Sequence, residues 1–254
     1  MQNRYPFPKH QHEVFPLTFL KVVAVSIYFD DINVSEKCKI LQKFFKDKFD
    51  LEYSESRILN LSSQDEKPIV ISNKEKTITF DFHKNCVRLG IKTPVYNSFK
   101  NIEDHLPIIS EFLSLTDIST IIKTVVFKAN ELSYSIPASS NLDNAITQIF
   151  SKELLEEGNY NFQEIEDKKL ASLEKNVIFV DNVSRTITTL VFGFSSLTNK
   201  DKGKLILKTL VENNESFESR DLDKNLLDIN SIADDAFRWS VTPDVIKAMK
   251  GELK

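Results

Sequence analysis

The sequence predicts an α+β fold: a mainly antiparallel sheet, or sheets, with helices packed on it. Segments with the β-branched, aromatic and alternating character of strands follow one another through connections too short for crossover helices. Segments with helical spacing of apolar residues and with capping signals lie between them. The 254 residues are 41% hydrophobic, so the chain can bury a full core without disulfides or metals.

The chain opens with an irregular arm, a strand and a helix. Residues 1–16 contain Pro6, Pro8 and Pro16, which favours an arm without regular structure. Residues 19–29 are β-branched and aromatic and predict a strand. Ser35 is then the expected cap of a helix that runs to about Phe49, and its apolar face would carry Cys38, Leu41 and Phe45.

Short strands are expected next, at 57–61 and 68–71. Residues 77–82 and 86–91 predict a hairpin around a turn at 83–85, because Ile78, Phe80 and Phe82 alternate with polar residues.

A helix that contains Pro107 follows. If it began at Asn101, the proline would lie past the first turn and remove a needed hydrogen-bond donor. With Asp104 as the N-cap, Pro107 stands at the third helical position, where no bond is lost. We therefore expect this helix to run from Asp104 to about Leu115.

The same order of elements then repeats. A long strand at 119–134 precedes a helix that begins at Asn141, and two helices close the chain at 231–239 and 243–250, the last with a cap at Thr242 and an N1 proline. Between these helices, strands are expected near 158–165, 175–181, 185–195 and 203–212. Residues 212–228 form the most polar segment and predict a long exposed loop, where partner contact or simple solvation are both reasonable.

The repeated order leaves the domain organisation open between two descriptions. The chain is expected to form a single α+β unit over residues 1–254, with similar halves at 17–116 and 117–254. Internal duplication and an ordinary succession of hairpins explain the pattern equally well.

Charge and composition predict where the protein is located and which kinds of partner it binds. The formal net charge is −4, without a basic run interleaved with aromatics, which disfavours nucleic acid as a partner. The sequence has neither a signal-peptide pattern nor a long apolar stretch, so we expect no membrane span. Two cysteines, Cys38 and Cys86, fit a reducing, cytoplasmic location.

Glycine usage disfavours the large nucleotide-binding classes. The chain has five glycines, and no two of them lie close enough for a phosphate-binding loop, in which glycine allows the backbone to approach phosphate. The sequence also lacks a G-x-S-x-G nucleophile elbow. We therefore expect no cofactor.

Histidine and cysteine offer few candidates for chemistry. His10 and His12 lie on one side of an extended segment, but a metal site needs three or four ligands, so a polar arm is the preferred interpretation. His83 and Cys86 flank a tight turn and are expected to diverge, which leaves Cys86 as a core residue rather than a nucleophile. His105 is expected at the surface.

Three pairs of neighbouring acidic residues are candidates for acid–base chemistry. Adjacent helical residues do not face one another, which weakens such a role for the pair at 234 and 235. The three pairs are Asp30-Asp31, Glu156-Glu157 and Asp234-Asp235. Asp30-Asp31 follows a strand end, where metal binding or acid–base chemistry is the alternative, but a turn with solvated acids is the preferred interpretation. Trp239, the single tryptophan, is expected to anchor a helix to the core.

The chain resembles a sporadically distributed bacterial family of about this length, for which no activity is established. The resemblance rests on an opening Pro-Leu segment before the first strand, a central strand that ends in Asn and is followed by Ile-Pro, and a C-terminal series of short motifs. In this sequence these are Phe15-Pro16-Leu17, Phe127-Lys128-Ala129-Asn130 with Ile136-Pro137, and Leu227-Asp228, Ala236-Phe237, Val241-Thr242 and Met249. The Arg and Tyr of the family's central strand are missing here. The resemblance implies an accessory role, such as one in a mobile or phage-defence locus.

Two functions remain open from the sequence. The first is a non-enzymatic interaction or assembly component that acts with another protein or by self-association, and it rests on the missing catalytic motifs and the mild charge. The second is a small-molecule-binding domain, with or without catalysis. Its apolar pocket would be lined by Phe residues together with Tyr28, Tyr96 and Asn130.

Overall fold

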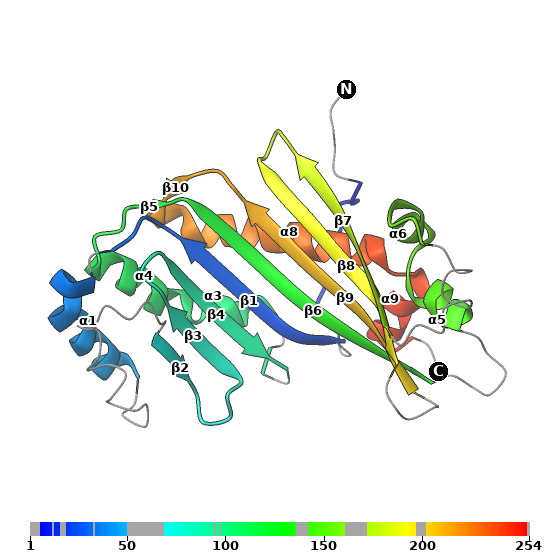
Figure 1. The fold of residues 1–254 in the computed structure, drawn as a ribbon, viewed down its shortest axis with the longest axis horizontal. Helices are drawn as coiled ribbons and strands as arrows, with labels where there is room; N and C mark the ends of the chain where they lie inside the picture. Colours follow the sequence, from blue (N-terminus) through cyan, green and yellow to red (C-terminus); the bar gives the residue numbers. More distant parts are fainter. Residues whose placement is uncertain are drawn as a thin grey trace. The chain divides into compact units, whose positions relative to one another are not determined.

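The predicted α+β class with an antiparallel sheet is confirmed in the computed structural model (Figure 1). The structure describes residues 6–11, 13–15, 19–32, 34–49, 69–93, 95–96, 98–135, 142–160, 172–196 and 202–252. Within them the strands of the main sheet follow the order β2-β3-β4-β1-β6-β9-β8-β7, and β10 and β5 form a separate two-stranded sheet.

The strands agree with most of the predicted positions. They are β1 (Leu20–Tyr28), β2 (Ile69–Ser72), β3 (Ile78–Phe82), β4 (Cys86–Lys92), β5 (Thr120–Ile121), β6 (Lys123–Ser135), β7 (Ser172–Asp181), β8 (Thr186–Ser196), β9 (Lys202–Asn213) and β10 (Phe217–Glu218). The helices are α1 (Val34–Lys48), α3 (Lys100–Glu103), α4 (Leu106–Leu115), α5 (Leu142–Ile149), α6 (Lys152–Glu157), α8 (Leu222–Ser240) and α9 (Pro243–Lys250). None of the helices in these described ranges combines the length and the apolar character that a membrane span requires.

The chain divides into two compact units, each built from separate parts of the sequence. Unit 1 comprises residues 1–21, 127–211 and 230–254, and unit 2 comprises residues 22–126 and 212–229. The predicted halves at 17–116 and 117–254 are contiguous, whereas these units interleave along the chain. Internal duplication stays a prediction.

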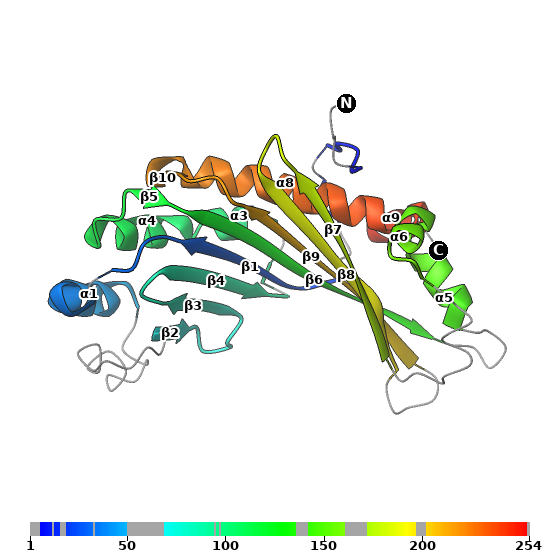
Figure 2. The same cartoon turned by 45° about the horizontal axis from the view of Figure 1, so that its top comes forward.

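Unit 2 has an aromatic core between its strands and two helices. In β1 the side chains of Val23, Val25 and Ile27 are fully buried, and β4 pairs with β1 through Tyr28 opposite Cys86. The strands β2, β3, β4 and β1 lie side by side in Figure 2. The ring of Phe82 lies 5.0 Å from that of Phe45 on α1 and 4.9 Å from that of Phe112 on α4, measured between centroids. This contact explains the alternating Phe residues of the predicted hairpin.

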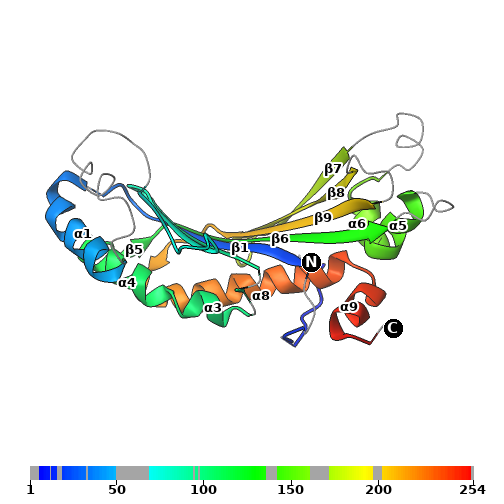
Figure 3. The same ribbon diagram turned by 90° about the horizontal axis from the view of Figure 1, so that it is seen from below.

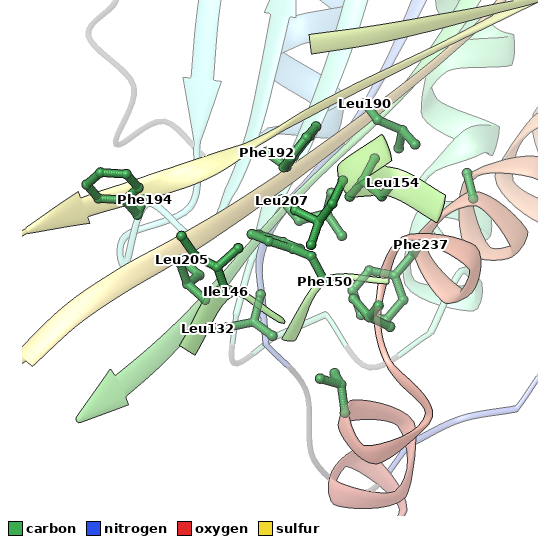
Figure 4. Close-up of a cluster of buried hydrophobic side chains, with 14 of the residues drawn as sticks. Leu132, Ile146, Phe150, Leu154, Leu190, Phe192, Phe194, Leu205, Leu207 and Phe237 are labelled. Atoms are coloured by element: carbon green, nitrogen blue, oxygen red, sulfur yellow. The ribbon is translucent and has the colours of Figure 1, made fainter. Parts of the chain in front are cut away.

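The core of unit 1 lies between its strands and helices α5, α6, α8 and α9 (Figures 3 and 4). Figure 3 shows α9 and the C-terminal part of α8 on one side of β6, β9, β8 and β7. On that side, which we call the inner face, alternate residues of β6, β9 and β8 are buried against the helices. Figure 4 labels ten of the residues in this cluster: Leu132, Ile146, Phe150, Leu154, Leu190, Phe192, Phe194, Leu205, Leu207 and Phe237.

Three helix starts differ from the prediction, and one of them is that of α8, which begins at Leu222 instead of residue 231. The helix predicted to begin at Asp104 is divided into α3 and α4, and His105 is the N-cap of α4. Pro107 therefore stands at the second helical position, where it removes no hydrogen bond. Helix α1 begins at Val34, so Ser35 lies inside the helix instead of capping it.

The polar segment 212–228 is not a long loop. It contains the end of β9, strand β10 and the first turns of α8, and Leu222 and Leu226 are buried. The charged residues around these leucines occupy the exposed side of an amphipathic helix, which composition alone does not distinguish from a loop.

Three further predicted strands have different outcomes. The strand expected near 158–165 is not formed at 158–160, where a turn follows α6, a helix that the sequence reading missed; residues 161–165 lie outside the described part of the chain. The strand at 57–61 also lies outside it, as does Asn141, the expected start of α5. The strand at 119–134 is interrupted at Ile122, between β5 and β6.

Candidate interaction surface

The two tyrosines of the predicted pocket both belong to unit 2. Tyr28 ends β1 and is 37% exposed, and the Nζ of Lys123 lies 5.3 Å from the centroid of its ring. Burial, followed by the charge of the Cys86 thiolate, raises the pKa of Tyr28. Tyr96 is buried after β4.

Asn130 belongs to unit 1, where it is buried on β6 and its Nδ2 donates to the carbonyl of Leu207 at 3.4 Å. A common pocket of Asn130, Tyr28 and Tyr96 therefore stays a prediction. A pocket of about 630 Å³ in unit 1 contains none of the three. Its lining consists of Thr147, Phe150, Lys152, Leu155, Glu156, Asn159, Tyr160 and Thr242.

The thiol and imidazole candidates lie on either side of the predicted turn, and the divergence of their side chains stays a prediction. His83 and Cys86 share a backbone hydrogen bond across the turn, from the His83 N–H to the Cys86 carbonyl at 2.8 Å. Burial raises the pKa of the Cys86 thiol to about 11, so the thiol is protonated at neutral pH and is a poor nucleophile. His105 is half-buried, a correction to its expected surface position. Its ring contacts that of Phe80, and burial lowers its pKa.

At least one member of each acidic pair has a polar partner. Asp31 lies 3.0 Å from the Nζ of Lys84, and Glu156 lies 3.4 Å from that of Lys152. Asp234 and Asp235 point to different partners, as expected for neighbours on a helix: Asp234 accepts from Lys128, and Asp235 accepts from the N–H of His10 at 2.9 Å. His12 lies outside the described residues.

Lys128 is a buried charged residue that the sequence reading did not single out. Its side chain is 6% exposed on the inner face of β6, and Asp234 also accepts a hydrogen bond from Asn230 at 3.3 Å. The strand alternation places residue 128 on the same face as Asn130, and this was the available signal. The arrangement ties α8 to β6 and needs no ligand to explain it.

The N-terminal arm is fastened to unit 1 by both apolar and charged contacts. Phe7 is buried, with ring centroids 5.4 Å from Trp239 and 5.1 Å from Phe179 of β7. Glu13 accepts from Arg238 and from Lys250, each at 3.2 Å, and these bonds lower its pKa. The ring centroid of Trp239 also lies 5.5 Å from that of Phe179 of β7, and Trp239 packs against the core cluster, so it anchors α8 as predicted.

The opposite side of the unit 1 strands, which we call the outer face, carries apolar side chains that are partly exposed or, on β7, exposed. All described helices that contribute to the cluster of Figure 4 pack on the inner face, so their side chains do not cover the outer one. Lys204 and Glu131 form an ion pair across this face, as do Lys208 and Glu174. Its apolar residues are Phe127, Ala129, Ile187, Val191, Ile206, Leu210, Ile178 and Val180.

Strand β7 is the last strand of the sheet and has β8 as its only strand partner in the described part of the chain. It is ten residues long and contains neither proline nor glycine. On its outer face Ile178 is 58% exposed and Val180 is 53% exposed. An edge strand of this length with exposed apolar side chains is a template for another strand.

Comparison of the sequence with protein-family models and with curated proteins gives no match. The resemblance to a bacterial family described above stays a prediction.

Proposed function

We propose that the protein is a non-enzymatic interaction component that binds protein by adding a β-strand to the free edge of β7. The observation that carries the proposal is the ten-residue edge of β7, which pairs with no second strand among the described residues and has Ile178 and Val180 more than half exposed. Strand addition supplies main-chain hydrogen bonds for affinity and alternate side-chain contacts for selectivity.

The chemistry of this edge defines the strand that it accepts. The outer face of β7 carries the exposed side chains of Ile178 and Val180. Near the start of the strand, Glu174 lies on the same face and forms an ion pair with Lys208. A partner strand with apolar side chains at alternate positions would cover these two residues. An accessory role in a mobile or phage-defence locus, which the family resemblance implies, is compatible with such a component.

Two substitutions on the exposed side of β7 test the proposal. The tagged protein, its Ile178→Lys/Val180→Lys variant and a Val70→Lys control are incubated with extract of the source cells. Val70 is a suitable control because it is 37% exposed on β2, the four-residue strand at the other end of the strand order. These positions face solvent, so the fold should tolerate lysine, and circular dichroism verifies this.

We expect the wild type and the Val70→Lys control to retain the same protein, which the double variant loses. Hydrogen exchange of the β7 amides should slow in the resulting complex, because the added strand occupies their free N–H groups. Equal retention by all three proteins, or retention without slower exchange in β7, would refute strand addition at this edge.

A further inference from the structure

The exposure of the outer face depends on whether a strand has neighbours on both sides. Ile187 and Val191 on β8, and Ile206 and Leu210 on β9, have neighbouring strands on both sides and are only partly exposed. Ile178 and Val180 have a neighbour on one side and are 58% and 53% exposed. A strand added beside β7 would bring these two residues to the exposure of the others.

We propose that the added strand is β7 of a second copy of this chain, paired antiparallel about a two-fold axis at Ile178. This inference rests on the proposed function and names its occupant. A two-fold axis normal to the sheet places the inner faces of the two copies on the same side. Residues opposite one another must therefore lie on the same face of β7, so their numbers are both even or both odd.

The charge pattern of β7 selects this register. With Ile178 opposite its own counterpart, Lys175 faces Asp181 of the second copy, and Val177 faces Phe179 of the second copy. Both of these pairs occur twice because of the symmetry. Opposite charges thus flank a central apolar block, which is the favourable arrangement for cross-strand neighbours.

The two nearest registers lack this complementarity. An axis at Val177 places Lys175 opposite Phe179 and Glu174 opposite Val180. An axis at Phe179 places Val177 opposite Asp181. Each of them sets a charged side chain against an apolar one, which leaves the charge without a partner across the pair.

The proposed pairing forms a closed dimer and not a fibre. The contact is isologous, so each copy uses its β7 edge once and has none left to offer. The strand at the other end of the order, β2, has four residues and provides a much shorter template.

Cysteine cross-linking of the purified full-length protein tests the pairing and its register. The background variant Cys38→Ser/Cys86→Ala removes the native thiols. Opposite residues of an antiparallel pair have Cα atoms about 4.5–5.5 Å apart, within the range that a disulfide spans. Ile178→Cys alone should therefore cross-link under mild oxidation.

The other positions fix the register. Asn176→Cys and Val180→Cys should each fail to cross-link alone, because residues four apart along a strand are about 13 Å apart. A mixture of these two variants should cross-link, since residue 176 faces residue 180 in the proposed register. Cross-linking in a mixture of Asn176→Cys with Ile178→Cys, or of Ile178→Cys with Val180→Cys, but not of Ile178→Cys alone, would overturn it.

Light scattering after size exclusion separates this inference from the proposed function. We expect a dimer of the wild type that Ile178→Lys/Val180→Lys converts to monomer, while Lys175→Glu raises the dissociation constant at least tenfold and Lys175→Glu/Asp181→Lys restores it. A monomer at 100 μM overturns self-pairing, but strand addition stands if the double lysine variant still loses its partner from extract. A dimer that neither lysine substitution nor cross-linking connects to β7 also overturns self-pairing, and the proposed function falls with it only if the double lysine variant keeps its partner from extract.

Discussion

Lys128 donates a hydrogen bond to Asp234 from a side chain that is only 6% exposed, whereas Asp234 is 38% exposed. The two partners therefore differ in what their loss would leave behind. Without Asp234, a buried ammonium group remains unpaired, whereas without Lys128 the carboxylate keeps access to water and its bond from Asn230.

We expect Asp234→Ala to lower the free energy of unfolding by about 3 kcal/mol, and Lys128→Met to lower it by about 1 kcal/mol or less. Lys128→Met/Asp234→Ala should be more stable than Asp234→Ala alone. Urea denaturation measures all three values. If Lys128→Met were less stable than Asp234→Ala, the loss of Asp234 would not leave a costly unpaired charge on Lys128, and this explanation would be wrong.

Alkaline pH should destabilise the folded protein through Cys86. Its pKa is raised from 9.0 to about 11 by burial, so the folded state retains a proton that the unfolded state releases. The stabilisation is present below pH 9 and is lost as the pH rises toward 11. Between pH 8 and 10.5 the wild type should lose about 2 kcal/mol more unfolding free energy than Cys86→Ala does, because only the wild type carries this group. Urea denaturation at pH 8 and at pH 10.5 measures the loss for both proteins. An equal loss of unfolding free energy in the wild type and in Cys86→Ala would contradict the raised pKa of the buried thiol.

Gly158 occupies a position that admits no side chain. A Cβ atom there would stand 2.4 Å from Cζ of Phe192, whose ring belongs to the buried cluster of unit 1. We expect Gly158→Ala to lower the unfolding free energy by about 1–3 kcal/mol, because the ring must move in a packed core. Gly90→Ala is the matched control, since nothing lies within 4 Å of its added Cβ and a strand tolerates alanine better than glycine. Equal denaturation midpoints for the two variants would contradict this packing.

The single tryptophan reports on the attachment of the N-terminal arm. Phe7→Ala removes the ring that packs against Trp239 and Phe179, so we expect a red shift of the fluorescence emission and a loss of about 3 kcal/mol. Val14→Ala, at a side chain that is 71% exposed, should leave both quantities unchanged. An unchanged emission maximum in Phe7→Ala would show that the arm does not cover the tryptophan in solution.

The elements were predictable where local periodicity is strong. The alternation in β1, β3, β4, β8 and β9 and the Thr-Pro-Asp start of α9 are local properties of the chain. Even there the hydrogen bonds depend on the surroundings. Thr242 stands at the N-cap position of α9 as predicted, but its hydroxyl donates to the carbonyl of Gln148 at 2.6 Å instead of bonding to the helix. The start of α8 was missed because its two buried leucines, Leu222 and Leu226, are surrounded by charged residues that occupy the solvent side.

The candidate surface was not predictable from the sequence. The pattern of β7 predicts a strand, but it does not say whether the strand lies in the middle of the sheet or at its edge. Residue 128 was likewise only a lysine in an apolar strand, because its carboxylate partner lies 106 positions away.

The sequence by itself determined the α+β class, the antiparallel pairing, most strand positions and the anchoring role of Trp239, because these follow from residue periodicity, short connections and the burial of large aromatic rings. The tertiary structure decided which strand is left without a neighbour, which charges are buried together and how the chain divides into units that interleave along it. These properties depend on pairings between distant segments, and residue order does not encode them locally.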